Sequence, residues 1–369
     1  MKLFVFAAIL LVSLSASAQT GKEWDDVSVN SLNREAAHTI VTPAENETQV
    51  MEDSRYYQSL NGVWKFKWVK DPTKKPSNFE APSFSVDGWD NIDVPSSWQV
   101  YGIRNGKSWD KPLYTNISYP FTYDKTTWSV MATRNSWQTY NENMKNPVGS
   151  YRRQFSVPST WTGRDVYLRF NGAGHGYYVW VNGKFVGYAE DADLPSEFKI
   201  TDYVNIGSEN TVAVQVYRFT SGSFLEDQDY WRLTGITRDV FLWSAPKTHL
   251  KDFFFTTKLT DSFTEAKVNL EYEIEGTDFE GCTLDAKLKS ADGTTISLGM
   301  MEGLDLQKAK GNFVATVSSP ELWSAETPNL YDLVVTLKKD GEAIDIRSCK
   351  VGFRQVGIRK DVALTINGK

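Results

Sequence analysis

Three carboxylates lie within four positions of one another, at Glu226, Asp227 and Asp229, and the aromatic residues Tyr230 and Trp231 follow them directly. Like charges this close repel one another, and burying them is costly unless each finds a partner. Rings beside carboxylates can hold a sugar, because rings cover the apolar faces of a pyranose and carboxylates accept hydrogen bonds from its hydroxyls. The alternative interpretation is an acidic surface loop with an aromatic anchor. The run therefore indicates either one wall of a sugar site or a solvated loop.

The composition is that of a globular protein with more than one domain. The chain has 369 residues, of which 41% are hydrophobic and 23% charged, so two or three domains are expected. The formal net charge is −6, so the sequence lacks the excess of basic residues that is typical of nucleic-acid-binding proteins. Nucleic acid is therefore not an expected partner. The 13 Trp, 17 Tyr and 20 Phe favour a strand-rich fold and also suit contact with carbohydrate.

The first eighteen residues have the pattern of a secretory signal peptide. Lys2 supplies the positive charge, Leu3 to Leu14 the apolar core, and Ala16 to Ala18 the small residues of a cleavage site. The apolar core is too short to span a membrane, and no later segment approaches the length of a span. We therefore expect an exported protein, periplasmic or secreted, without a membrane span.

The cysteines and histidines are few and scattered. Cys282 and Cys349 lie in strand-like sequence, where they can form a disulfide or be buried as small hydrophobic residues. His38, His175 and His249 do not combine with cysteines in a zinc pattern, nor in the pattern of a nucleophilic triad. We expect His175 to be a core residue rather than a ligand.

Short strands and no amphipathic helix follow a polar arm at residues 19–55, and they predict an all-β sandwich over residues 56–245. The clearest hairpin runs from Tyr177 to Tyr188, because Asn182-Gly183 suits the two positive φ values of a type I′ turn. Trp98 and Trp180 are expected in the core. The other expected strands are Val63–Trp68, Tyr151–Phe155, Asp165–Phe170, Thr211–Arg218 and Asp239–Trp243.

A second sandwich is predicted for residues 246–352. Ala266, Val268, Leu270, Tyr272 and Ile274 alternate with polar residues, and about seven strands in roughly 105 residues is the size of an immunoglobulin-like domain. The remaining residues, 353–369, read as a short strand and a hairpin turn whose partner strand is missing, so the chain is expected to stop within an element.

Several long motifs, in order, resemble the N-terminal part of glycoside hydrolase family 2, and within it the large β-galactosidases. The similar stretches are LNREAAH from Leu32, SLNGVWKFKW from Ser59, VPSSWQVYG from Val94, YTNISYP from Tyr114, WVNGKFVGYAEDADLPSEF from Trp180, SGSFLEDQDYWRLTGITRDV from Ser221, ELWSAETPNLY from Glu321 and VGFRQVGI from Val351. The resemblance implies a jelly-roll sugar-binding domain, an immunoglobulin-like domain and then a (β/α)₈ barrel, of which residues 353–369 would be the truncated start. Barrel enzymes place their chemistry at the C-terminal ends of the strands. Both catalytic glutamates are therefore expected beyond Lys369, and this chain alone is expected to be inactive.

The resemblance implies roles for two residues. Asn116 is similar to the asparagine that reaches from the jelly roll to the sugar, although it could instead form an Asx turn. Asp229 is similar to the aspartate that contacts the galactosyl hydroxyls and a sodium ion, whose other ligands would come from the barrel. Asp229 could also form a buried ion pair with Arg232 or Arg238.

Other acids and aromatics receive weaker interpretations. Structural pairing is the favoured role of Glu226 and Asp227. The acids of AEDADLPSEF are expected at turns and interfaces; they are Glu190, Asp191, Asp193 and Glu197. Between Pro120 and Tyr151 the loop is enlarged relative to well-known members, and we expect its aromatics to shape the subsite beyond galactose. These aromatics are Trp128, Trp137 and Tyr140.

The whole pattern predicts the non-catalytic part of an exported retaining β-galactosidase, which acts on galactosides or other β-linked glycans together with its own barrel. The alternatives are a stand-alone carbohydrate-binding or scaffold protein, and the same part of a β-glucuronidase or β-mannosidase. No cofactor is expected for this chain, whereas sodium and magnesium could serve the complete enzyme. The LNREAAH arm resembles a segment that supports subunit contacts, so a homo-oligomer is an open alternative.

Overall fold

The structure is a computed structural model that describes residues 19–39, 41–49, 51–115, 121–123, 130–135, 146–191, 193–226, 229–304 and 308–369. Regular structure in these ranges is mostly β-strand, arranged as two sandwiches that are joined between Ala245 and His249. We call them the first sandwich (residues 57–245) and the second sandwich (residues 249–351). The all-β prediction is confirmed.

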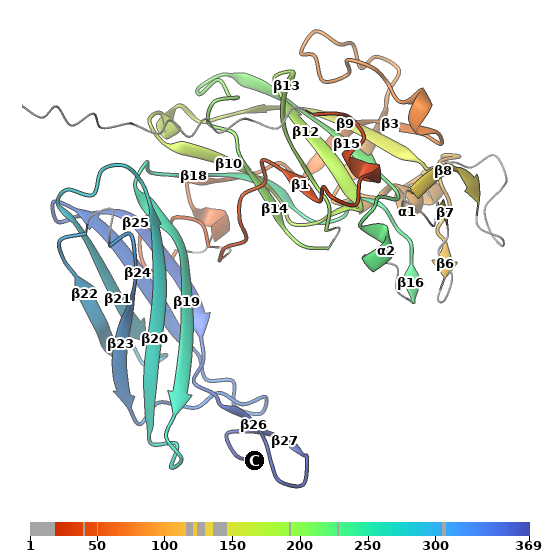
Figure 1. Cartoon of the computed structure of the whole chain (residues 1–369). Coiled ribbons are helices and arrows are strands. Elements are labelled where there is room, and N and C mark those ends of the chain that lie inside the picture. Colours follow the sequence, from red (N-terminus) through yellow and green to blue (C-terminus); the bar gives the residue numbers. More distant parts are fainter. Residues whose placement is uncertain are drawn as a thin grey trace, which may run out of the picture.

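The first sandwich is built from two main sheets that enclose one core (Figure 1). In spatial order, the larger sheet contains β1 (Ser31–Leu32), β13 (Lys184–Ala189), β12 (Gly176–Val181), β15 (Glu209–Tyr217), β9 (Val148–Ser156), β3 (Gly62–Val69) and β4 (Asp90–Val94). The smaller sheet contains β14 (Ser196–Lys199), β10 (Asp165–Phe170), β18 (Val240–Ala245) and β2 (Tyr57–Ser59).

Several short strands and two helices lie outside these two sheets. The remaining pairings are β11 (Ala173–Gly174) with β17 (Gly235–Ile236) and β5 (Ser96–Ser97), β16 (Tyr230–Trp231) with β6 (Tyr114–Thr115), and β7 (Phe121–Tyr123) with β8 (Val130–Asn135). The helices are α1 (Trp98–Arg104) and α2 (Ser223–Glu226), with 3-10 turns at Glu23–Asp25, Met51–Asp53, Pro72–Lys74 and Ser159–Trp161. The sequence did not predict α1, which begins where the Ser97 side chain accepts a hydrogen bond from the backbone N–H of Val100.

Aromatic residues fill both faces of the larger sheet. Trp64 and Phe66 lie in the core between the sheets, as the alternation in β3 predicts, and Trp98 of α1 lies in the same core. Trp180 is also buried, but on the opposite face of the larger sheet, where Tyr178 packs beside it. The expectation that Trp98 and Trp180 are buried is confirmed.

The predicted hairpin is present between β12 and β13. Asn182 and Gly183 have φ values of 51° and 79°, which are the two positive values that a type I′ turn requires. Strand β1 of the arm then pairs with β13, so the hairpin lies inside the larger sheet rather than at its edge.

The arm contacts both sandwiches. The ring of Trp24 stacks on that of Tyr217 at 5.1 Å between centroids, and β1 continues the larger sheet. Further along, the Thr39 hydroxyl donates to the carbonyl oxygen of Phe253 at 2.7 Å, and Glu47 pairs with Lys287 at 2.6 Å. The arm therefore bridges the two sandwiches, which its polar composition alone does not indicate.

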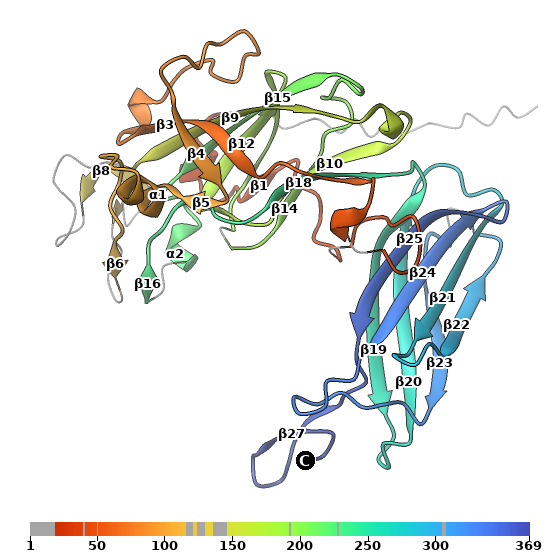
Figure 2. The ribbon, with the colours of Figure 1, turned by 180° about the vertical axis from the view of Figure 1, so that it is seen from behind.

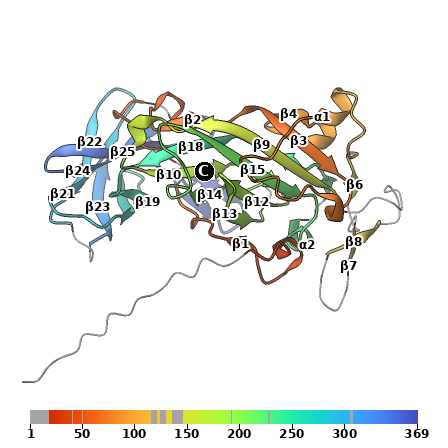
Figure 3. The same ribbon diagram turned by 90° about the horizontal axis from the view of Figure 1, so that it is seen from above.

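The second sandwich has seven strands among the described residues, as the sequence predicts, and lies beyond the β10–β18 end of the first sandwich (Figure 3). One sheet contains β19 (His249–Leu259), β20 (Glu265–Glu275) and β23 (Lys310–Ser318), and the other contains β22 (Thr295–Met301), β21 (Cys282–Lys289), β24 (Tyr331–Lys339) and β25 (Glu342–Val351). The predicted inward row of β20, from Ala266 to Ile274, is buried. Cys282 and Cys349 are both free thiols.

The final residues form a hairpin of their own at the far end of the second sandwich (Figure 1). Strands β26 (Val356–Ile358) and β27 (Leu364–Ile366) pair in antiparallel register. The prediction that this strand lacks a partner is therefore wrong, because the residues read as a turn supply the second strand. Four apolar side chains on this hairpin, those of Val356, Ile358, Val362 and Leu364, are more than half exposed.

Candidate functional site

Asp229 lies at an exposed tip of the first sandwich. It directly precedes β16, which pairs with β6 so that Trp231 is opposite Tyr114. These two strands and α2 project from the same side of the first sandwich (Figures 1 and 2). The tip therefore brings together residues that are more than a hundred positions apart in the sequence.

The Asp229 carboxylate is exposed and accepts a hydrogen bond from the Tyr114 hydroxyl. The rings of Tyr114 and Trp231 lie 5.9 Å apart, and both residues are about half exposed, at 50% and 56%. The tip thus offers a carboxylate that accepts hydrogen bonds next to two aromatic surfaces, which is the combination that a pyranose can use. The alternative of a buried ion pair with Arg232 or Arg238 is not what the structure contains, because Asp229 is exposed.

A buried framework holds β6 and β16 in place. The guanidinium of Arg218, which follows β15, forms an ion pair with Asp110, and both side chains are fully buried. Arg218 also donates to the backbone carbonyl oxygens of Lys111 at 3.2 Å and Arg232 at 3.0 Å. The N–H of Arg232 in turn donates to the carbonyl oxygen of Leu113 at 2.6 Å. The buried Arg218 side chain therefore holds together the segment that precedes β6 and the segment that follows β16.

The same framework reaches α1. The Asp110 carboxylate accepts hydrogen bonds from the Trp98 indole at 3.3 Å and from the Gln99 amide at 3.2 Å. The Gln99 side-chain oxygen accepts a hydrogen bond from the N–H of Thr234 at 2.9 Å. Sequence reasoning did not single out Asp110 or Arg218, and their positions in ordinary polar stretches give no local signal.

Side-chain contacts of His175 and Glu190 hold α2 and the residues just before it in place. The Nδ1 atom of His175 lies 2.6 Å from a carboxylate oxygen of Glu226, and the histidine is 4% exposed. This contact confirms a structural pairing for Glu226 and a core position for His175. The Glu190 carboxylate accepts hydrogen bonds from the hydroxyls of Tyr188 at 2.6 Å and Ser221 at 3.0 Å, and burial raises the pKa of Glu190 to about 7.

Two acids of the AEDADLPSEF motif, Asp191 and Glu197, lie at the contact between the arm and the first sandwich. Asp191 pairs with Arg34 at 3.2 Å, and the buried Glu197 binds His38 at 2.9 Å and Arg169 at 3.1 Å. Burial opposes the ionisation of Glu197, but the hydrogen bond and charge of His38 outweigh burial and hold the pKa of this carboxyl below its usual value. The expectation of interface roles is confirmed for these residues.

Five residues singled out in the sequence lie outside the described residues: Asn116, Trp128, Trp137, Tyr140 and Asp227. Of the two residues expected to bind substrate, the structure therefore places Asp229. It adds Tyr114 as the partner of Asp229. Because Tyr114 opens the YTNISYP motif, its closeness to Asn116 in the sequence was the available signal.

The described residues supply few ligands for a cation at this tip. Asp229 contributes one carboxylate, whereas hard cations take six or more oxygen ligands. In the described part of the chain, no three His, Cys, Asp or Glu side chains are grouped as a metal site would require. The described residues of the tip therefore supply one of the several oxygen ligands that a cation needs.

No helix within the described ranges has the length and apolar character needed to cross a membrane.

Comparison with known proteins gives two family matches. Residues 57–246 match the model described as glycosyl hydrolases family 2, sugar binding domain, and residues 248–354 match the model described as glycosyl hydrolases family 2. Over 366 residues the chain is 38% identical to a protein of Priestia megaterium named beta-galactosidase. That match covers 96% of this chain but 34% of the relative, so the chain spans about a third of its length.

Solved structures share the fold at lower identity. A glycosyl hydrolase family 2 member from Bacteroides cellulosilyticus has a TM-score of 0.62 and 23% identity, over 85% of this chain and 37% of that one. A Bifidobacterium dentium beta-glucuronidase has a TM-score of 0.65 and 20% identity, over 87% of this chain and 52% of that one. These likenesses support the arrangement of the two sandwiches, and their low identity carries no information on substrate.

Proposed function

The chain belongs to glycosyl hydrolase family 2, and on that premise we propose that it is the N-terminal, non-catalytic part of a retaining β-galactosidase. The observation that carries this proposal is the 38% identity to a beta-galactosidase along 96% of the chain. In this proposal the complete enzyme hydrolyses terminal β-galactosides. The first sandwich supplies one wall of the galactose site.

Asp229 is the residue that we propose to contact galactose. Its carboxylate can accept hydrogen bonds from two sugar hydroxyls, and the Tyr114 hydroxyl fixes its orientation. The half-exposed rings of Tyr114 and Trp231 offer apolar surface at the same tip. If these contacts strengthen as the sugar reaches the transition state, they raise kcat, whereas equal binding of both states would lower only KM.

The charges at the tip favour a neutral sugar. A β-glucuronide carries a carboxylate, which requires cationic partners rather than another carboxylate. Among the described residues at the tip, the Asp229 carboxylate is exposed, whereas the neighbouring Arg232 is only 2% exposed. This arrangement supports a galactoside over a glucuronide as the substrate of the complete enzyme.

The catalytic glutamates, in this proposal, belong to a barrel encoded beyond Lys369. Retaining enzymes place an acid/base and a nucleophilic carboxylate about 5 Å apart. The barrel would also supply the further oxygen ligands that a sodium ion beside Asp229 needs. The length of the Priestia relative, of which this chain covers 34%, leaves room for such a domain. Export to the periplasm or the medium is proposed from the signal-like pattern of the first eighteen residues.

The test uses the full-length protein with chromogenic galactosyl, glucuronyl and mannosyl substrates. We expect the galactoside to be cleaved with the highest kcat/KM. Asp229→Asn should lower that value roughly 10- to 100-fold, which is the range for losing a hydrogen bond to a charged group. Asp202→Asn, at an exposed position elsewhere on the first sandwich, is the matched control and should leave kcat/KM unchanged.

Two results would overturn the proposal. A preference for glucuronide or mannoside would reassign the substrate, and an unchanged kcat/KM in Asp229→Asn would remove this residue from the site. The isolated 369-residue chain, assayed beside the full-length protein, is expected to cleave none of the three substrates. Hydrolysis by the isolated chain would show that it contains its own catalytic residues.

A further inference from the structure

One face of the second sandwich carries an ordered polar surface with an exposed ring on its edge strand β19 (His249–Leu259). It is the outer face of the sheet formed by β19, β20 and β23, which faces the viewer in Figure 1 with no other described element in front of it. Cross-strand pairing places Phe254, Glu271 and Asn312 side by side in one row across the three strands. Residues paired in this way point to the same side of a sheet.

The ring of this row is exposed although its neighbours in the sequence are not. Phe254 is 61% exposed, whereas Phe253 is buried in the core of the sandwich. The alternation of β19 therefore places this ring in water, and a single exposed apolar side chain is ordinary on a protein surface. Such a residue is informative when the groups around it are also arranged for binding.

Hydrogen bonds order the polar groups beside the ring. The Asn312 amide donates to the side-chain oxygen of Asn269 at 2.6 Å, and the Asn269 amide donates to the Glu271 carboxylate at 3.1 Å. Each amide retains a further donor or acceptor, and the carboxylate retains lone pairs. Because these groups are already fixed by one another, a ligand would not have to bear the whole entropic cost of ordering them.

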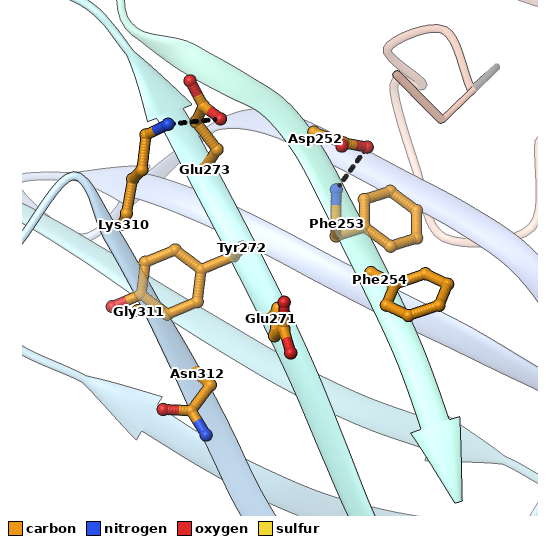
Figure 4. A pocket seen from close by; sticks show the side chains of 9 residues that line it. All are labelled: Asp252, Phe253, Phe254, Glu271, Tyr272, Glu273, Lys310, Gly311 and Asn312. Carbon is orange, nitrogen blue, oxygen red and sulfur yellow. Dashed lines mark hydrogen bonds and ion pairs between the residues drawn. The ribbon is translucent and has the colours of Figure 1, made fainter. Parts of the chain in front are cut away.

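The row forms part of an open hollow of about 470 Å³ (Figure 4). At one end of the hollow Lys310 pairs with Glu273 at 2.9 Å, and Asp252 accepts a hydrogen bond from the backbone N–H of Thr39 in the arm at 2.8 Å. Ion-paired and arm-bound side chains therefore border the hollow at this end.

We propose that this hollow binds a neutral glycan chain, with Phe254 as the stacking platform and Asn269, Glu271 and Asn312 as partners of the sugar hydroxyls. A ring surrounded by donors and acceptors matches the apolar faces and hydroxyl edge of a pyranose. Three carboxylates against one ammonium in the hollow repel anionic polysaccharides and nucleic acids. The surface lies on the second sandwich, apart from Asp229, so it can hold a glycan whichever sugar the Asp229 site accepts.

A second copy of the chain is the competing occupant. The cores of protein interfaces are depleted in charged residues and enriched in apolar ones. Here the exposed apolar side chains of Phe254 and Val314 lie on the two outer strands, and Asn269 and Glu271 of β20 lie between them. The apolar surface is therefore interrupted by polar groups, unlike the core of a stable dimer interface. The hydrogen-bonded side chains of Asn269, Glu271 and Asn312 therefore favour a glycan over a second copy of the chain as the occupant.

The experiment is native affinity electrophoresis of the full chain in gels that contain neutral galactan, neutral galactomannan or anionic polygalacturonate. We expect retardation by a neutral polysaccharide and none by polygalacturonate. Phe254→Ala should weaken that retardation about tenfold, and Asn312→Ala several-fold, since each removes one of the proposed contacts. Met300→Ala is the matched control, because Met300 is 57% exposed on the other sheet of the same sandwich.

Two further measurements distinguish a lost glycan contact from unfolding and from binding at Asp229. Thermal unfolding should show that Phe254→Ala remains folded, and Asp229→Asn should retain the retardation of the wild type. Retardation that survives Phe254→Ala and Asn312→Ala, or that is lost only with Asp229→Asn, would overturn the proposal. So would the absence of retardation in every neutral gel, or a dimer in light scattering that Phe254→Ala converts to a monomer.

Discussion

The buried ion pair between Arg218 and Asp110 offers the sharpest test of how the candidate sugar site is positioned. Both side chains have no exposed surface, and the Asp110 carboxylate also accepts hydrogen bonds from Trp98 and Gln99. Asp110→Ala would leave a buried guanidinium without this partner. Removing one member of a buried ion pair costs about 3–5 kcal/mol, because the remaining charge is desolvated and uncompensated.

Urea unfolding followed by tryptophan fluorescence measures this loss in the first sandwich. Twelve of the 13 tryptophans precede residue 245, so the signal reports almost entirely on the unit that contains the pair. With a denaturant slope of about 3 kcal/mol per molar, the urea midpoint should fall by roughly 1–1.7 M. Asp90→Ala breaks the exposed pair with Lys107 and is the matched control, expected to cost below about 1 kcal/mol.

A double variant separates the unpaired charge from the lost packing. Asp110→Ala combined with Arg218→Met removes the guanidinium that the single change leaves buried. It should therefore be less destabilised than the sum of the two single variants, by about 1–3 kcal/mol. Strict additivity, or a loss in Asp110→Ala no larger than that in Asp90→Ala, would refute the reasoning that this charge pair holds the site segments together.

Two further predictions concern His249, at the start of β19, and Gly235, in β17. Burial lowers the pKa of His249 to about 4, whereas a histidine in the unfolded chain has a pKa near 6.5. Between pH 4 and pH 6.5 the unfolded chain therefore binds more protons than the folded one, and the free energy of unfolding falls as the pH drops. Between pH 6.5 and pH 5 the wild type should lose about 1.5 kcal/mol more than His249→Gln, measured by calorimetry; equal losses would contradict this. Gly235 has a φ of 147°, and a Cβ there would lie 2.6 Å from the carbonyl oxygen of Ser96. Gly235→Ala should cost about 1–3 kcal/mol in urea unfolding, and a neutral result would mean that the backbone relaxes freely.

Local patterns in the sequence were enough to predict much of the fold. The alternation from Ala266 to Ile274 needs only the two-residue period of a strand, and Asn182-Gly183 needs only its own φ values, so both were predictable. Helix α1 and the second strand of the final hairpin were missed. Both are short, and tertiary contacts rather than periodicity stabilise elements of that length.

The sequence by itself determined that acids and rings gather near Asp229 and that the chain folds as two β-sandwiches. Only the tertiary structure decided which groups meet: Tyr114 with Asp229, His175 with Glu226, and the row that exposes Phe254. The physical reason is that hydrogen bonds between side chains and sheet register join residues far apart in the chain. No local spacing encodes which distant strand will supply the partner.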